Sequence, residues 1–140
     1  MKNHIARRRF PVALALLPSL VAAALLAGCS KVPDTLKIGV AQPLTGPLGA
    51  LGQDLLNGVN LAVQELNKDG FMVDGKRVKL EVVALDDKAD AATGKQVAQQ
   101  LVDAGVVAVI GHLNSGVSIE TAPIYAAKSI PQIAISTNPK

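Results

Sequence analysis

Hydrophobic residues recur along the chain with two different spacings. Short apolar or alternating runs, of the kind that form strands, cover residues 36–41, 77–85, 106–110 and 132–135. Segments that can form helices lie between them, at residues 54–68, 90–104 and 119–128. In the first of these, Leu55, Val59, Ala62 and Leu66 fall on one helical face. The order β-α-β-α-β-α-β predicts an α/β fold, an open parallel sheet with helices on both faces.

Local signals agree with these boundaries. Gly70 is placed to end the first helix in a left-handed conformation. Asp74-Gly75 marks a turn before the second strand, and Asp90 is a candidate N-cap for the second helix. Pro123 fits the third helix if it lies in the first turn. The five apolar residues 106–110 predict a strand that is buried on both faces.

The loops that follow the strands are where a ligand would bind. Right-handed crossovers bring these loops to one edge of the sheet, and ligands of open α/β sheets bind in the crevice there. The loop at residues 111–118, Gly-His-Leu-Asn-Ser-Gly-Val-Ser, offers hydroxyls and backbone N–H groups just before a helix. Such a helix N-terminus favours a carboxylate or a phosphate. We therefore expect this loop to hold the charged end of a small ligand.

Other candidate sites are weaker. The loop from Gly46 to Gly52 superficially resembles a dinucleotide fingerprint, but its glycines are three apart throughout and Pro47 has no N–H to give to a phosphate. Asp86 and Asp87 could act as a carboxylate pair. Adjacent strand residues point to opposite faces, however, so a solvated strand end and cap is the simpler interpretation. No cofactor and no metal site is expected.

Two single residues of the loop at 111–118 have alternative roles. His112 could be a base or a ligand, but no second His or Cys is near it in sequence, which favours a packed or hydrogen-bonded histidine. Ser115 could hydrogen-bond a ligand, cap the helix or act as a nucleophile. No nucleophile elbow surrounds it, so a role in ligand binding is favoured. The sequence offers no organised catalytic group, and the protein is not expected to be an enzyme.

The N-terminus predicts export. Residues 1–9 carry four basic residues and no acid, and residues 10–28 are almost entirely apolar, as in a secretory signal. The segment Leu-Ala-Gly-Cys at residues 26–29 resembles a bacterial lipoprotein box, in which Cys29 would be lipidated and become the mature N-terminus. We expect a lipoprotein signal peptide at residues 1–28, a tether at 29–35, and lipid anchoring of an extracytoplasmic domain to a membrane.

Removing the signal changes the charge. The whole chain carries a net charge of +3, but four of its 14 Lys and Arg residues precede Cys29. The remaining ten face 11 acidic residues, which leaves a net charge near −1. The mature part has no basic stripe with aromatic residues, so no nucleic-acid partner is expected.

Several segments together resemble the periplasmic leucine/isoleucine/valine-binding proteins, the substrate-binding components of branched-chain amino-acid ABC transporters. The segments are residues 36–47, 86–87, 111–116, 123–125, 130–133 and 137–139. The resemblance implies a type I periplasmic-binding-protein fold of two lobes that close on a ligand. Residues 36–140 would be an incomplete N-terminal lobe, with the second lobe absent, so we expect a fragment of a longer protein.

The resemblance also implies site residues. It assigns the ligand carboxylate to Ser115, with Gly116 in the same loop, and to Thr137. The carbonyl that takes the ammonium falls on Ile135, or on Ser136 as the alternative, because this segment is one residue shorter than in the family and lacks its proline. Leu51 stands where leucine-binding members carry a tyrosine near the ligand.

The expected function is the extracytoplasmic binding of a branched-chain or related amino acid for uptake through an ABC permease. The alternative is a sensor or receptor module of the same fold for an amide, a urea or an aromatic acid. The 140-residue chain by itself should bind its ligand weakly or not at all, because half of the cleft is missing.

Overall fold

The computed structural model describes residues 31–135, and a compact unit begins at Val32. Cys29, Ser136 and Thr137 lie outside the described residues. No helix within residues 31–135 combines the length and the apolar character needed to cross a membrane.

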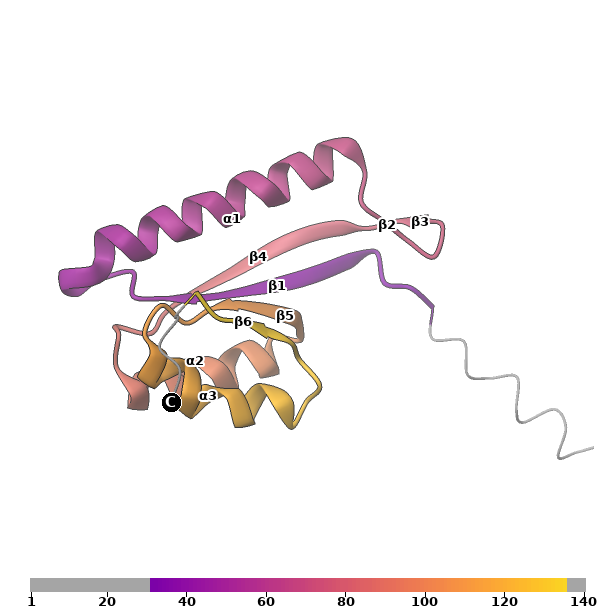
Figure 1. The fold of residues 1–140 in the computed structure, drawn as a ribbon. Helices are drawn as coiled ribbons and strands as arrows, with labels where there is room; N and C mark the ends of the chain where they lie inside the picture. Colours follow the sequence, from indigo (N-terminus) through magenta and orange to yellow (C-terminus); the bar gives the residue numbers. More distant parts are fainter. Residues whose placement is uncertain (1–30, 136–140) are drawn as a thin grey trace, which may run out of the picture. The chain divides into compact units, whose positions relative to one another are not determined.

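A parallel four-stranded sheet forms the centre of the unit (Figure 1). Its strands are β1 (Thr35–Gln42), β4 (Lys79–Asp86), β5 (Val106–Gly111) and β6 (Gln132–Ile133), in the order β4-β1-β5-β6. β1 pairs with β4 on one side and with β5 on the other, so that Gln42 lies opposite Asp86 and Ala41 lies opposite Gly111. The predicted α/β parallel sheet is confirmed, and the carboxyl ends of its three long strands lie at one edge.

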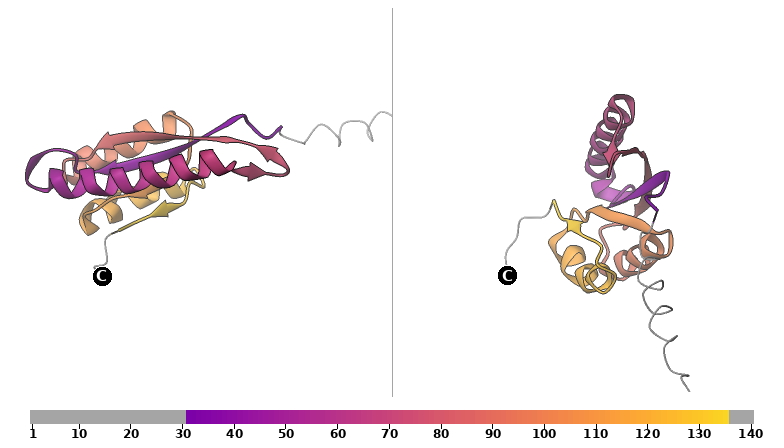
Figure 2. Two further views of the ribbon diagram at one scale, coloured as in Figure 1. Left: turned by 90° about the horizontal axis from the view of Figure 1, so that it is seen from above. Right: turned by 90° about the vertical axis from the view of Figure 1, so that its right-hand side faces the viewer.

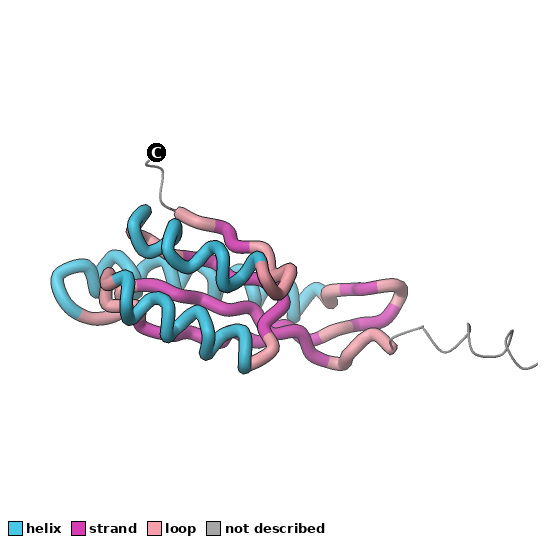
Figure 3. Tube along the Cα trace, turned by 90° about the horizontal axis from the view of Figure 1, so that it is seen from below, coloured by secondary structure: helices cyan, strands magenta, loops and turns pink. Residues whose placement is uncertain are grey.

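Helices cover both faces of the sheet, as predicted. α1 (Gly49–Asp69) lies on one face, whereas α2 (Ala91–Asp103) and α3 (Ser115–Ala126) lie side by side on the other (Figures 1 to 3). The main core is between the sheet and the α2–α3 layer. Its buried hydrophobic residues are Ala41, Val97, Ala98, Leu101, Val106, Val109 and Tyr125. Val97 and Leu101 of α2 belong to this core and pack against the strands.

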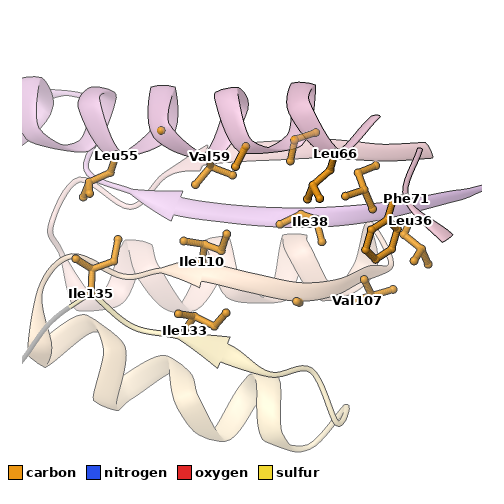
Figure 4. Close-up of a pocket in the computed structure, with 15 residues that line it drawn as sticks. Leu36, Ile38, Leu55, Val59, Leu66, Phe71, Val107, Ile110, Ile133 and Ile135 are labelled. Carbon is orange, nitrogen blue, oxygen red and sulfur yellow. The ribbon is translucent and has the colours of Figure 1, made fainter. Parts of the chain in front are cut away.

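The face that carries α1 is only partly covered. α1 packs against β1 and β4, and an open groove of about 550 Å³ remains between it and the β5–β6 side (Figure 4). Only apolar residues line the groove. Val107 of β5 is 41% exposed there, so the prediction that this strand is buried on both faces is wrong. The reason is that no helix among the described residues covers this part of the face.

The connection from β1 to α1 is more helical than predicted. A 3-10 turn, η2 (Gly46–Leu48), leads directly into α1, which begins five residues before the predicted start at Asp54. The first turn of α1 lies very close to the end of β1. A Cβ atom at Gly52 would be 2.1 Å from the carbonyl oxygen of Pro43. Glycine is therefore required there by the close approach of two backbone segments.

α3 also begins earlier than predicted, at Ser115 instead of Ile119. Its N-cap is Asn114, whose backbone is extended (φ −89°, ψ 128°). Pro123 is consequently the ninth residue of the helix, and its predicted place in the first turn is wrong. A proline at that position leaves the carbonyl of Ile119 without its helical donor. Ile119 and Pro123 both lie on the exposed side of the helix.

The predicted turn at Asp74-Gly75 and the predicted helix cap at Asp90 are both present. A hairpin of β2 (Met72–Val73) and β3 (Lys76–Arg77) turns at Asp74-Gly75, where both φ angles are positive, as a type I′ turn requires. Asp90 is the N-cap of α2, and its carboxylate accepts the backbone N–H of Thr93 at 2.7 Å. That bond and a second one from the Thr93 hydroxyl hold the pKa of Asp90 below its usual range.

Asp86, the last residue of β4, fastens the loop that follows β1. Its Oδ1 accepts the backbone N–H groups of Leu44 and Lys88 at 2.8 and 2.9 Å, and its Oδ2 accepts the Thr45 hydroxyl at 2.5 Å. Burial by itself would raise the pKa of Asp86. The bonds from Thr45, Lys88 and Leu44 together outweigh it and hold this pKa below its usual range. The ionised carboxylate is therefore the form that the fold stabilises.

Gly52→Ala should destabilise the unit by about 2 kcal/mol, because the new Cβ atom forces the β1–α1 connection apart. Gly58→Ala is the matched control in the same helix, where a Cβ atom meets nothing within 4 Å. It should stabilise the unit by about 0.5–1 kcal/mol through helix propensity. Thermal unfolding followed by circular dichroism measures both. Equal effects of the two substitutions would contradict the close approach at Pro43.

Asp86→Asn should lower the free energy of unfolding by about 1–2 kcal/mol at pH 7, because charge-assisted hydrogen bonds are lost. A carboxyl group whose pKa is lower in the folded state than its unfolded value of about 4 stabilises the folded protein above pH 4. This stabilisation is lost as the pH falls through the pKa of the folded state. The difference from the wild type should therefore shrink below pH 4. Urea titrations at several pH values measure this, with the exposed Asp54→Asn as control. A constant difference down to pH 2 would refute the assignment.

Candidate functional site

The carboxyl edge of the sheet contains a topological switch point. The connection after β1 leads to α1 on one face, whereas the connection after β5 leads to α3 on the opposite face (Figure 2). β1 and β5 are neighbours in the sheet, so their two connections diverge. Ligands of open α/β sheets bind at such a point. The predicted loops after β1 and β5 therefore come together at one edge.

The connection after β5 is short, and Gly111, the last residue of β5, lies directly against β1. Gly111 has φ +145°, and a Cβ atom at this position would be 2.1 Å from the carbonyl oxygen of Ala41. Only residues 112–114 then separate the strand from α3. The predicted eight-residue loop is thus a three-residue connection followed by the first turn of a helix.

Ser115 is the first residue of α3, and it is half-buried beside the exposed Gly116. The carbonyl of Asn114 accepts the N–H of Ser118 at 3.0 Å, but the Asn114 side chain makes no capping hydrogen bond. The alternative of Ser115 as the helix cap is therefore wrong. Within residues 31–135, the N-cap residue thus leaves the first turn of α3 without a side-chain cap, and Ser115 is the first residue of that turn. A carboxylate suits the N–H donors of such a turn and the positive end of the helix dipole.

The other predicted ligand residues do not belong to the first turn of α3. Leu51 lies in the first turn of α1 and is 54% exposed. Ile135 follows β6, and its side chain lines the apolar groove (Figure 4). Ser136, Thr137 and the lipidation residue Cys29 lie outside the described residues, so their roles remain predictions.

The two adjacent aspartates point in different directions, as expected at the end of a strand. Asp86 binds the loop after β1, whereas Asp87 is fully buried. The Oδ2 atom of Asp87 lies 2.6 Å from Nδ1 of His112, and its Oδ1 accepts the N–H of Ala89 at 2.9 Å. The prediction of a solvated strand end is therefore wrong for Asp87, because a buried imidazole and a backbone N–H replace water around its carboxylate.

His112 is a packed and hydrogen-bonded histidine, as predicted. Its ring is 0% exposed, and its Nε2 lies 3.2 Å from the hydroxyl of Tyr125. Burial raises the pKa of Tyr125, and the nearby Asp87 carboxylate raises it further. Both ring nitrogens of His112 already have partners in the interior, so the ring is not placed to act as a base on a ligand.

Sequence reasoning missed two buried polar residues at this edge, Gln42 and Tyr125. Gln42 ends β1 and donates from Nε2 to the carbonyl of Ile110 at 3.5 Å. Tyr125 reaches His112 from the other end of α3. A signal for Tyr125 existed, since it is the single tyrosine of the chain and a buried tyrosine hydroxyl needs a partner. Within residues 31–135, no group of three His, Cys, Asp or Glu side chains could hold a metal ion.

Comparison with known proteins agrees with this geometry. The sequence profile of the Periplasmic binding protein family matches residues 35–140. A Leu/Ile/Val-binding protein homolog 2 from Brucella abortus (strain 2308) is 47% identical over 103 residues, which are 73% of this chain and 27% of the relative. The chain thus spans about a quarter of the length of that relative.

Solved structures show the same fold. The branched-chain amino acid transporter substrate-binding protein LivJ from Streptococcus pneumoniae, in complex with isoleucine, has a TM-score of 0.67 at 34% identity and covers 76% of this chain and 30% of its own. An ABC-transporter solute-binding protein from Rhodopseudomonas palustris BisB5, in complex with 3,4-dihydroxybenzoic acid, has a TM-score of 0.62 at 30% identity and covers 74% and 28%. The family profile, these relatives and the shared fold together show that the chain belongs to the Periplasmic binding protein family.

Proposed function

We propose that this chain is the carboxylate-binding part of an extracytoplasmic substrate-binding component of an ABC transporter, which takes up a branched-chain or related amino acid. The observation that carries the proposal is the first turn of α3. It lies at the switch point of the sheet, its N-cap residue Asn114 makes no side-chain capping bond within the described part of the chain, and Ser115 is its first residue. The names and ligands of the relatives support an amino acid as the molecule that binds there.

The two charged ends of an amino acid need different partners. The Ser115 hydroxyl and the N–H groups of the first turn of α3 donate to the carboxylate, with Thr137 as a second hydroxyl donor. The ammonium group needs an acceptor, for which the carbonyl of Ile135 or of Ser136 is proposed. Leu51, exposed in the first turn of α1, is available to the ligand side chain. The second lobe would complete the cleft.

The apolar groove beside α1 is not the proposed ligand site. Its lining contains no charged or hydrogen-bonding side chain (Figure 4). Burial of a carboxylate or an ammonium group without partners costs several kcal/mol. A free amino acid therefore favours the polar carboxyl edge of the sheet, where hydrogen-bond donors are available.

A lipid anchor and a permease partner complete the proposal. Lipidation of Cys29 would tether the protein to a membrane surface, and residues 29–35 would separate the lipid from the fold. The closed, ligand-loaded protein would then present its amino acid to the ABC permease.

A second candidate is a module of the same fold that binds an aromatic acid, an amide or a urea, in uptake or sensing. The observation that favours it is the Rhodopseudomonas palustris relative, which was solved with an aromatic acid. This ligand shares the carboxylate but lacks the α-ammonium group. The carboxylate site proposed at Ser115 therefore serves both candidates, and the remaining contacts decide between them.

A titration of the chain with isoleucine, followed by the backbone amide signals in nuclear magnetic resonance, tests the proposal. Half of a cleft should bind with a Kd of the order of millimolar, about −4 kcal/mol. The signals of residues 115–117 should move most. Isoleucinamide, which lacks the carboxylate, should leave them unchanged, and 3,4-dihydroxybenzoate tests the second candidate.

Ser115→Ala should weaken isoleucine binding about tenfold, the loss expected for one charge-assisted hydrogen bond. Ser129→Ala, an exposed serine beyond the opposite end of α3, should have no effect. Shifts that are absent from residues 115–117 at 50 mM isoleucine, or that appear equally with isoleucinamide, would refute the carboxylate site.

Cys29→Ala tests the anchor separately. In a bacterial host fed with labelled palmitate, the wild-type chain should acquire the label and sediment with membranes. The variant should lose the label, because no thiol remains in the chain to carry the lipid. Labelling of the variant, or an unlabelled wild type, would contradict lipidation at Cys29.

A further inference from the structure

A buried chain of hydrogen bonds joins the two ends of α3 to the carboxyl edge of the sheet. Asp87, just after β4, contacts His112 at 2.6 Å, and His112, just after β5, contacts Tyr125 in the last turn of α3 at 3.2 Å. All three side chains are 0% exposed. The rings of His112 and Tyr125 are stacked, with centroids 6.2 Å apart and an interplanar angle of 28°. The ligand site proposed above does not use any of these side chains.

Burial restricts where the protons of these three hydrogen-bonded side chains can lie. The Oδ1 atom of Asp87 accepts from Ala89, and its Oδ2 faces Nδ1 of His112, so an ionised carboxylate needs a proton on Nδ1. Among the described residues, the Tyr125 hydroxyl has Nε2 of His112 as its hydrogen-bond partner. If Nε2 carried a proton, that hydroxyl proton would have no acceptor. A neutral ring with its proton on Nδ1 satisfies every donor, whereas each other arrangement leaves a buried donor unpaired.

The same hydrogen-bonded side chains restrain the connection that leads to Ser115. The Asp87 N–H donates to the carbonyl of Gln42 at 3.0 Å, so Asp87 is fixed to the end of β1. The His112 carbonyl accepts the Ser118 hydroxyl at 3.2 Å. The first residue of the three-residue connection is thus held by its side chain and by its carbonyl. Ser115 follows only three positions later.

We propose that Asp87, His112 and Tyr125 form a positioning relay, with His112 in its Nδ1–H tautomer, that holds Ser115 and the first turn of α3 in place for the ligand carboxylate. The link to the carboxylate rests on the function proposed above, whereas the tautomer and the restraint of the turn do not. Fixing donors before a ligand arrives reduces the entropy that binding must overcome. The relay residues are positioning residues and do not touch the ligand.

Nitrogen-15 spectroscopy of the imidazole tests the relay directly. The chain contains two histidines, His4 and His112, so His4→Gln leaves one ring to observe. The expected result at neutral pH is a protonated Nδ1 and an unprotonated Nε2. In Asp87→Asn, whose carboxamide oxygen would keep the Ala89 bond, the amide group must donate to Nδ1, so the proton should move to Nε2. An Nε2–H ring in the wild type, or a tautomer unchanged by Asp87→Asn, would overturn the relay.

Hydrogen exchange tests the restraint of the first turn. The probe is the Ser118 amide, bonded to Asn114 at 3.0 Å, and the reference is the Val109 amide in β5, bonded to Pro131 at 2.9 Å. Tyr125→Phe keeps the ring and removes only the hydroxyl. It should raise the Ser118 rate relative to Val109 about tenfold, whereas the control Asn67→Ala, which removes bonds to Leu80, should leave the ratio unchanged. An unchanged ratio in Tyr125→Phe would overturn the positioning role.

The isoleucine titration separates this inference from the proposed function. Tyr125→Phe should weaken binding about fivefold to tenfold while the fold remains intact, and unchanged affinity would overturn the link to the ligand. If the wild type shows the predicted tautomer and exchange but no shifts at residues 115–117 with isoleucine, the proposed function fails and the relay stands.

Discussion

Parallel pairing of β1 with both of its neighbours is the constraint on which the rest of this structure depends. The pairing aligns Gln42 with Asp86 and Ala41 with Gly111, so the carboxyl ends of three strands meet at one edge. Right-handed crossovers then place the helix after β1 and the helix after β5 on opposite faces of the sheet. The divergence of these two connections is a consequence of chain topology. The side chains at this edge determine what can bind there.

The two aspartates at this edge of the sheet support different parts of the structure. Asp86 faces the loop after β1 and fastens Leu44 and Thr45 to the end of β4. Asp87 faces the interior and contacts His112. Both carboxylates are therefore engaged by neighbouring hydrogen-bond donors. The first turn of α3 follows His112, whose side chain and carbonyl are held by internal hydrogen bonds.

The sequence predicted the architecture well because most local signals agreed with the fold. Apolar strands, the Asp90 cap and the Asp74-Gly75 turn all lie where their residue types indicated. The starts of α1 and α3 were misplaced, and near each of them a glycine allows a close backbone approach, Gly52 to Pro43 and Gly111 to Ala41, that no periodic pattern reveals. The contacts of Asp87 with His112 and of His112 with Tyr125 were also missed. They span 25 and 13 positions, and no periodic pattern encodes such contacts. Ser115 stays a predicted ligand residue, for which the loop type and the family resemblance are the two arguments.

The most direct measurement is a crystal structure, with isoleucine present, of a ligand-binding protein that contains this chain. The account predicts one carboxylate oxygen within about 3 Å of the Ser115 hydroxyl and of a backbone N–H in the first turn of α3, the distance of a charge-assisted hydrogen bond. A ligand whose carboxylate lies away from α3, or a ligand bound in the apolar groove beside α1, would contradict it.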